Sequence, residues 1–88
     1  MDLDRPWAIH PQVSIRPEPF GALVYHFGTR KLSFLKDPAL LEVVRGLEAA
    51  PSARAACAAA GVSEAELPRF AAALGALARS SMLVERAA

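Results

Sequence analysis

The chain has 88 residues, a formal net charge of +1 and 53% hydrophobic residues, 19 residues of the chain being alanine. That length allows one domain with one modest core, and a nearly neutral chain has no overall attraction to nucleic acid or to an anionic membrane. The longest apolar run, residues 55–62, is too short to cross a bilayer. Residues 1–5 do not form a secretory signal, so we expect a cytoplasmic protein without membrane contact.

An extended arm and a small sheet are predicted for the first 35 residues. Residues 1–12 contain two prolines and predict the arm, whereas three strand-like runs occupy residues 13–16, 22–27 and 31–35. The connections between these runs are short, which predicts an antiparallel three-stranded meander over residues 13–35. We expect one set of side chains to face the core and another to face solvent. The predicted inward set is Leu23, Tyr25, Phe27, Leu32 and Phe34, and the predicted outward set is His26, Lys31 and Ser33.

The apolar period becomes helical after Asp37-Pro38, a pair that suits an N-cap followed by a first helical position. Pro51 ends this first helix. Ser52 is the predicted cap of a short second helix over residues 53–60, and Gly61 ends that helix.

A capping box, Ser63-x-x-Glu66, opens the third helix. Its apolar stripe consists of Leu67, Phe70, Leu74 and Leu77. The three helices occupy residues 38–81, and residues 82–88 form an extended tail. The predicted fold is therefore a single α+β domain over residues 1–88, winged-helix-like, with a three-stranded antiparallel meander followed by three helices.

The residues that catalysis needs are missing. One cysteine and two histidines do not form a recognisable zinc set, and no glycine-rich phosphate loop is present. The carboxylates are scattered along the chain. We therefore predict that the chain is not an enzyme and carries no cofactor or metal. Cys57 lies in an alanine-rich run and is expected to be a small buried residue.

Residues 57–63 resemble the core of a helix-turn-helix, which suggests nucleic-acid binding as an alternative function. The third helix, however, opens with Glu64 and Glu66. Carboxylates at that end would be repelled by phosphates, and only Arg69 and Arg79 follow them on the helix. Nucleic acid is therefore not an expected partner.

Three local blocks point to a family. They are RPEPFG at residues 16–21, YHF at residues 25–27 and TRKLSFL at residues 29–35, within a continuous signature over residues 10–35. This signature resembles the mycofactocin biosynthesis chaperones, which belong to the precursor-peptide recognition elements and are distantly similar to the pyrroloquinoline quinone peptide chaperone. The resemblance extends from Trp7 to Arg86, nearly the whole chain.

The resemblance implies a binding function. Members of this family bind the leader of a ribosomally made precursor peptide and present it to a radical S-adenosylmethionine maturase, which modifies the peptide's C-terminal tyrosine and valine. In related domains the leader adds as a strand to the third strand, beside the third helix. The peptide-binding residues that the resemblance implies are Arg30, Lys31, Leu32, Ser33, Phe34, Leu35, Leu67, Phe70, Leu74 and Leu77.

Local charge agrees with an acidic leader. Residues 16–36 contain four basic residues and one acid, Glu18, so this region carries a local charge of +3. The same cations also protect an edge strand against aggregation, and both interpretations remain open. A third hypothesis is a structural adaptor that holds an enzyme without contacting a peptide.

Overall fold

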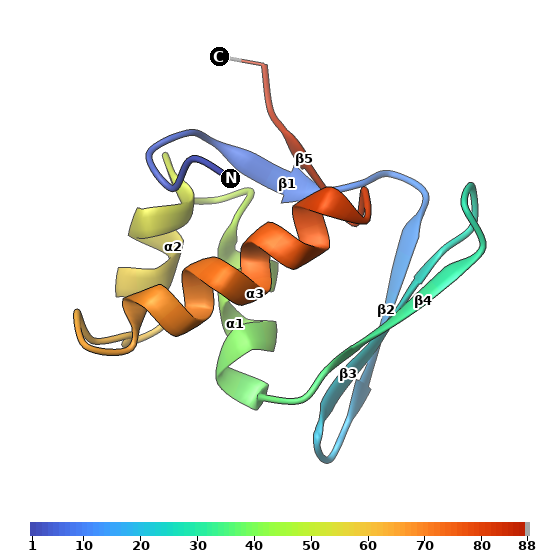
Figure 1. Cartoon of the computed structure of the whole chain (residues 1–88), viewed down its shortest axis with the longest axis horizontal. Helices are drawn as coiled ribbons and strands as arrows, with labels where there is room; N and C mark the ends of the chain where they lie inside the picture. Colours follow the sequence, from blue (N-terminus) through green and yellow to red (C-terminus); the bar gives the residue numbers. More distant parts are fainter. Residues whose placement is uncertain (88) are drawn as a thin grey trace.

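The computed structural model describes residues 1–87 and shows an α+β fold with a three-stranded antiparallel sheet ahead of three helices, as the sequence predicts (Figure 1). Ala88, the last residue of the predicted domain and tail, lies outside the described residues. The elements in chain order are β1 (Trp7–Ile9), β2 (Val13–Glu18), β3 (Gly21–His26), β4 (Lys31–Leu35), α1 (Pro38–Gly46), α2 (Ala53–Ala59), α3 (Leu67–Arg79) and β5 (Leu83–Glu85).

The meander has the strand order β2-β3-β4, with both pairs antiparallel, so β2 and β4 are its edges. The sequence predicts that β2 stops before Pro17, yet the strand continues to Glu18. Pro17 pairs with Ala22 on an edge strand. A missing N–H costs nothing there, because that position is directed away from the sheet.

The side-chain orientation predicted for this sheet was wrong. Ala22, Val24 and His26 are buried, whereas Phe27 is 63% exposed. Leu23, Tyr25, Leu32 and Phe34, which were predicted to face inward, lie on the face away from the helices, and Phe27 lies just beyond the end of β3 on the same side. Leu23 and Tyr25 are partly exposed there, and Leu32 and Phe34 are exposed. The residues that face the helices are Val13, Ile15, Ala22, Val24, His26, Ser33 and Leu35.

The reason for this orientation lies in the size of the inner side chains. β3 is apolar at nearly every position, so alternation alone does not specify its inner face. The short side chains of Ala22 and Val24 let α1 pack closely on the sheet. Gly21 has φ +146, and a Cβ at this position would lie 2.0 Å from the carbonyl oxygen of Leu35. Only glycine permits this approach, which aligns the start of β3 with the end of β4.

The predicted helix caps are confirmed. Asp37 accepts a 2.8 Å hydrogen bond from the N–H of Ala39, and Ser52 accepts one of 3.0 Å from Ala55. The hydrogen bond from the N–H of Ala39, together with an ion pair to Arg69, holds the pKa of the Asp37 carboxyl below its usual value. Ser63 and Glu66 also form their capping box, although the regular helix α3 begins only at Leu67.

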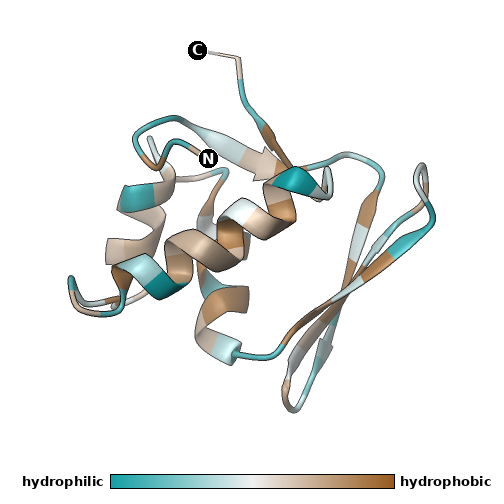
Figure 2. Cartoon of the chain, in the orientation of Figure 1, coloured by the Kyte–Doolittle hydropathy of each residue, from teal (hydrophilic) through white to brown (hydrophobic). Residues whose placement is uncertain are grey.

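The core lies between the three helices and the inner face of the sheet. α1 contributes Leu40, Leu41, Val43 and Val44, and α3 contributes Phe70, Leu74 and Leu77. Cys57 is buried in this core as predicted, and burial raises the pKa of its thiol. In Figure 2, α3 is coloured mostly in brown and pale shades between hydrophilic residues near its two ends. Within residues 1–87, no helix has the length and apolar character needed to span a membrane.

A second sheet joins the two ends of the chain. The predicted arm and tail pair as β1 and β5, antiparallel, with Trp7 opposite Glu85 (Figure 1). Arg86 fixes this closure. Its guanidinium donates to the carbonyl oxygens of Trp7 (2.9 Å) and of Leu47 (3.3 Å) and Ala50 beyond the end of α1. The sequence did not predict this pairing, because strands of three residues carry little periodic signal.

Replacing Gly21 by alanine should destabilise the protein by about 2 kcal/mol or more, because the new Cβ meets backbone and the residue keeps a positive φ. Thermal denaturation would measure this as a fall in Tm of roughly 10 °C. Gly46→Ala is the matched control, since a Cβ there meets nothing within 4 Å. The control should be neutral or stabilising, and equal effects of the two variants would contradict the role assigned to Gly21.

Candidate functional site

Within residues 1–87, no strand pairs with the outer backbone edge of β4. The N–H of Phe27 donates to the carbonyl oxygen of Gln12 at 2.8 Å, in register with the β2–β3 pairs. Since hydrogen-bonding direction alternates along a strand, the odd-numbered residues of β3 bond to β2 and its even-numbered residues bond to β4. The backbone of Ser33, opposite Val24, therefore points to β3. The N–H and C=O groups of Leu32 and Phe34 point away from the sheet.

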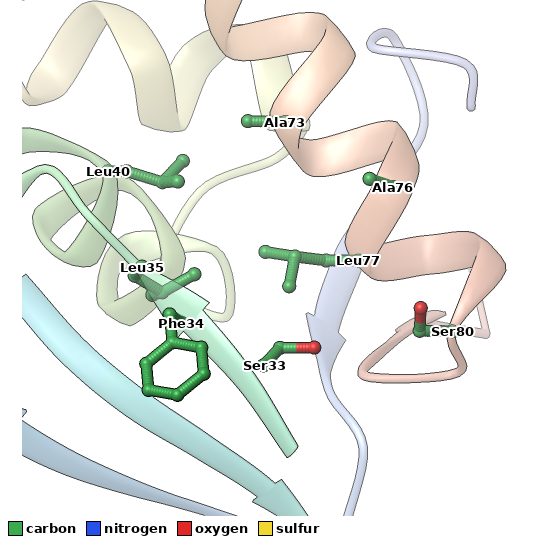
Figure 3. Close-up of a pocket in the computed structure, with 8 residues that line it drawn as sticks. All are labelled: Ser33, Phe34, Leu35, Leu40, Ala73, Ala76, Leu77 and Ser80. Carbon is green, nitrogen blue, oxygen red and sulfur yellow. The ribbon is translucent and has the colours of Figure 1, made fainter. Parts of the chain in front are cut away.

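A pocket of about 270 Å³ lies between this edge and α3. It is mostly apolar, with two hydroxyl groups, those of Ser33 and Ser80. In Figure 3, Leu77 projects from α3 toward β4, whereas the ring of Phe34 points away from the helix. The lining residues are Ser33, Phe34, Leu35, Leu40, Ala73, Ala76, Leu77 and Ser80.

Short side chains on α3 keep this pocket open. Ala73, Ala76 and Ser80 follow one another at spacings of three and four residues, which places them on one side of the helix. Their small size leaves the space next to β4 unfilled. Phe70 and Leu74 lie on the neighbouring side of α3 and are buried in the core.

The residues predicted for the site divide into two groups. The β4 residues surround the free edge, with Leu35 buried and its neighbours wholly or partly exposed. On the predicted stripe of α3, Leu77 alone lines the pocket, Leu67 is half-buried at the helix start, and Phe70 and Leu74 are core residues. Sequence reasoning missed four lining residues, which are Leu40, Ala73, Ala76 and Ser80. Their position beside the apolar stripe is the signal that could have found those on α3.

Unneutralised cations flank β4. Arg30 precedes the strand, Lys31 begins it and Lys36 follows it, and all three are exposed. Among residues 1–87, no carboxylate lies within 4.0 Å of these three side chains. Arg16, in contrast, pairs with Glu18 at 3.0 Å. Both ends of the free edge therefore carry positive charge.

His26 has a structural position rather than the solvated one predicted for it. It is buried against His10, with ring centroids 4.4 Å apart. Its Nδ1 accepts hydrogen bonds from the N–H groups of Gly28 (3.0 Å) and Thr29 (3.1 Å), which holds the turn between β3 and β4. The prediction that His26 faces solvent was wrong. Among the residues that the structure describes, no group of three His, Cys, Asp or Glu side chains could hold a metal ion.

Comparison with known proteins places these features in a family. The model of the peptide chaperone MftB family matches residues 6–84. Peptide chaperone MftB of Mycobacterium ulcerans is 58% identical over 87 residues, which cover 99% of this chain and 80% of the relative. The proteins of the same name from Mycobacterium tuberculosis and Mycolicibacterium smegmatis are 56% and 55% identical, over 97% and 94% of this chain and 78% and 81% of theirs. No solved structure matches the chain. The resemblance predicted from the sequence is confirmed, and the chain belongs to the MftB peptide chaperone family.

Proposed function

We propose that this chain binds the leader of a ribosomally made precursor peptide as an added strand on β4, and presents it to a radical S-adenosylmethionine maturase in mycofactocin biosynthesis. The observation that carries the proposal is the free edge of β4 beside an apolar pocket. In this proposal the chain works in the cytoplasm, has no catalytic role and binds no nucleic acid. The modification of the peptide's tyrosine and valine is left to the maturase.

The free edge of β4 binds a peptide through backbone hydrogen bonds, which do not depend on the side chains of the peptide. Leu32 and Phe34 offer two N–H donors and two C=O acceptors to an incoming strand, and each bond contributes about 0.5–1.5 kcal/mol. Main-chain bonds of this kind accept many sequences. The edge therefore accounts for binding and not for selectivity.

The pocket supplies selectivity. Side chains of a strand alternate between its two faces, so one row of the added strand points toward α3. At about 270 Å³, the pocket is smaller than a typical cavity for a drug-sized ligand and has room for one or two side chains. Its apolar lining selects aliphatic or aromatic residues. Ser33 and Ser80 are available for a hydrogen bond at one side.

The charges around β4 favour an acidic leader. Arg30, Lys31 and Lys36 have no neutralising partner among residues 1–87, so their field extends into solvent. Opposite charge on the leader raises the association rate more than it lowers the dissociation rate.

Amide hydrogen exchange followed by NMR tests the proposal directly. On addition of leader peptide, protection should appear at the N–H groups of Leu32 and Phe34, whereas Ser33 should be protected before and after. Residues 40–47 of the first helix should not change. Protection at the Gly61 turn and the start of α3 instead, with β4 unaffected, would refute strand addition and favour the helix-turn-helix surface.

Leu32→Pro should weaken leader binding by about fivefold, because it removes one edge donor worth about 1 kcal/mol without breaking a bond to β3. Isothermal titration calorimetry measures the change. Leu32→Thr is the matched control, because it shortens the side chain but keeps the N–H. If both variants bind equally well, the backbone of Leu32 takes no part in binding.

The double variant Arg30→Glu/Lys31→Glu should slow association of an acidic leader at low salt, since it reverses the field at one end of β4. Stopped-flow fluorescence over a range of salt concentrations provides the rates. The far-UV circular dichroism spectrum should not change, because both side chains are exposed. At high salt the variant and the wild type should converge, and an unchanged rate at low salt would refute electrostatic steering.

A further inference from the structure

The face of the β2-β3-β4 sheet that points away from the helices is apolar over β3 and β4, and no segment within residues 1–87 covers it. We call it the outer sheet face. Four of its large side chains leave between 44% and 63% of their surface exposed. Two aromatic pairs lie on it, Tyr25 with Phe27 at 5.0 Å between ring centroids and Phe20 with Phe34 at 6.4 Å. The apolar residues of the outer sheet face are Phe20, Leu23, Tyr25, Phe27, Leu32 and Phe34. Ser14 and Arg16 of the edge strand β2 lie on the same face, opposite Tyr25 and Leu23.

The exposed aromatic and aliphatic side chains gathered on one face indicate an interaction surface. Soluble monomers rarely expose a contiguous apolar patch larger than a few hundred Å², and patches of that kind mark interaction sites. Aromatic residues also dominate the binding energy of protein interfaces. No segment within residues 1–87 covers these side chains.

The outer sheet face and the pocket lie on opposite sides of β4. Ser33 and Leu35 direct their side chains toward α3, whereas Leu32 and Phe34 direct theirs to the outer face. Figure 3 shows this separation at Phe34, whose ring points away from the helix. A peptide in the pocket therefore leaves the outer sheet face free for a second partner.

Charge decides what kind of partner covers this face. Arg30 lies at one end of β4 and Lys36 at the other, and both are exposed and unneutralised among residues 1–87. A second copy of this chain would bring like charges together across the interface, which is unfavourable. The face fits a different folded protein, apolar at the centre of its contact surface and acidic around it.

A peptide strand on β4 would enlarge the same face. An added strand extends the sheet, and its outward row of side chains would lie beside Leu32 and Phe34. A partner on the outer sheet face would then contact the chain and the peptide together. Binding of the peptide would raise the affinity for that partner and, by linkage, the reverse also holds.

We propose that the outer sheet face docks the maturase, and that the maturase binds it more tightly when a peptide occupies β4. This inference rests on the proposed function for the identity of the partner. The location of the maturase on this face is inferred from three features, which are the apolar face, the cations at its ends and the separate pocket.

The test uses purified maturase, in its cluster-loaded form, and the full chain, with and without saturating leader peptide. The variant Tyr25→Thr/Phe27→Ser removes apolar surface from the outer sheet face on the β3 side, away from the free edge of β4 and the pocket. Its Kd for the maturase should rise at least about tenfold, as truncation of interface aromatics does. Its Kd for the leader should stay within about twofold of the wild type. Saturating leader should lower the Kd of the wild type for the maturase.

The variant Ala76→Phe should do the opposite, because it should abolish leader binding and leave maturase binding intact. Ala76 is exposed on α3 and lines the pocket, so a phenyl group there fills the site without disturbing the core. Leader binding should be lost, while affinity for the maturase in the absence of peptide should stay at the wild-type value. Ala58→Phe, at an exposed position on α2, controls for an added aromatic side chain.

Each remaining outcome overturns a different statement. Unchanged maturase affinity in the Tyr25→Thr/Phe27→Ser variant, with intact leader binding, refutes the docking surface and leaves the proposed function standing. A wild type that binds leader but not maturase refutes both presentation and docking. Self-association of the wild type that this variant abolishes, measured by analytical ultracentrifugation, assigns the face to a second copy and also refutes the inference.

Discussion

The close approach of Gly21 to the carbonyl of Leu35 fixes how the start of β3 pairs with the end of β4. A shift of one residue in this pairing would move every side chain of β4 to the opposite face, because side chains alternate with a period of two. In the observed register, Ala22 and Val24 lie under α1, and the larger residues lie on the other side. Because the small residues pack under α1, the larger apolar residues of β3 and β4 lie on the exposed face.

The same register creates the candidate binding site. It directs the backbone of Leu32 and Phe34 away from β3, and it points the side chains of Ser33 and Leu35 toward α3. A free edge next to an apolar pocket is a hazard for aggregation, and cations at the ends of an edge strand reduce that hazard. Protection and steering are compatible, since Arg30 and Lys31 repel the like-charged edge of another copy and attract an acidic peptide.

The sequence predicted the features that depend on local interactions. Asp37 and Ser52 were identified as caps because their side chains bond to the N–H groups just after them, and the structure shows these bonds. The pairing of β1 with β5 joins segments at opposite ends of the chain, so no local pattern contains it. The inner face of β3 depends on how closely α1 approaches, which the alternation of a fully apolar strand does not encode. The pocket was only partly predictable because alanine, the residue that opens it on α3, carries almost no signal in a chain so rich in alanine.

The placement of large side chains outside and small ones inside has an energetic consequence. Burying a Phe or Leu side chain stabilises a fold by about 1.5–3 kcal/mol, and the isolated chain forgoes much of that at Phe27, Leu32 and Phe34. The free energy of unfolding of a domain of this size is small. Apolar surface that stays exposed after folding can be buried when a partner binds. A peptide strand added to β4 would lie next to that surface. In the proposed arrangement, one three-stranded sheet holds a peptide by its edge while a partner covers its face, and the stability of each contact depends on the other.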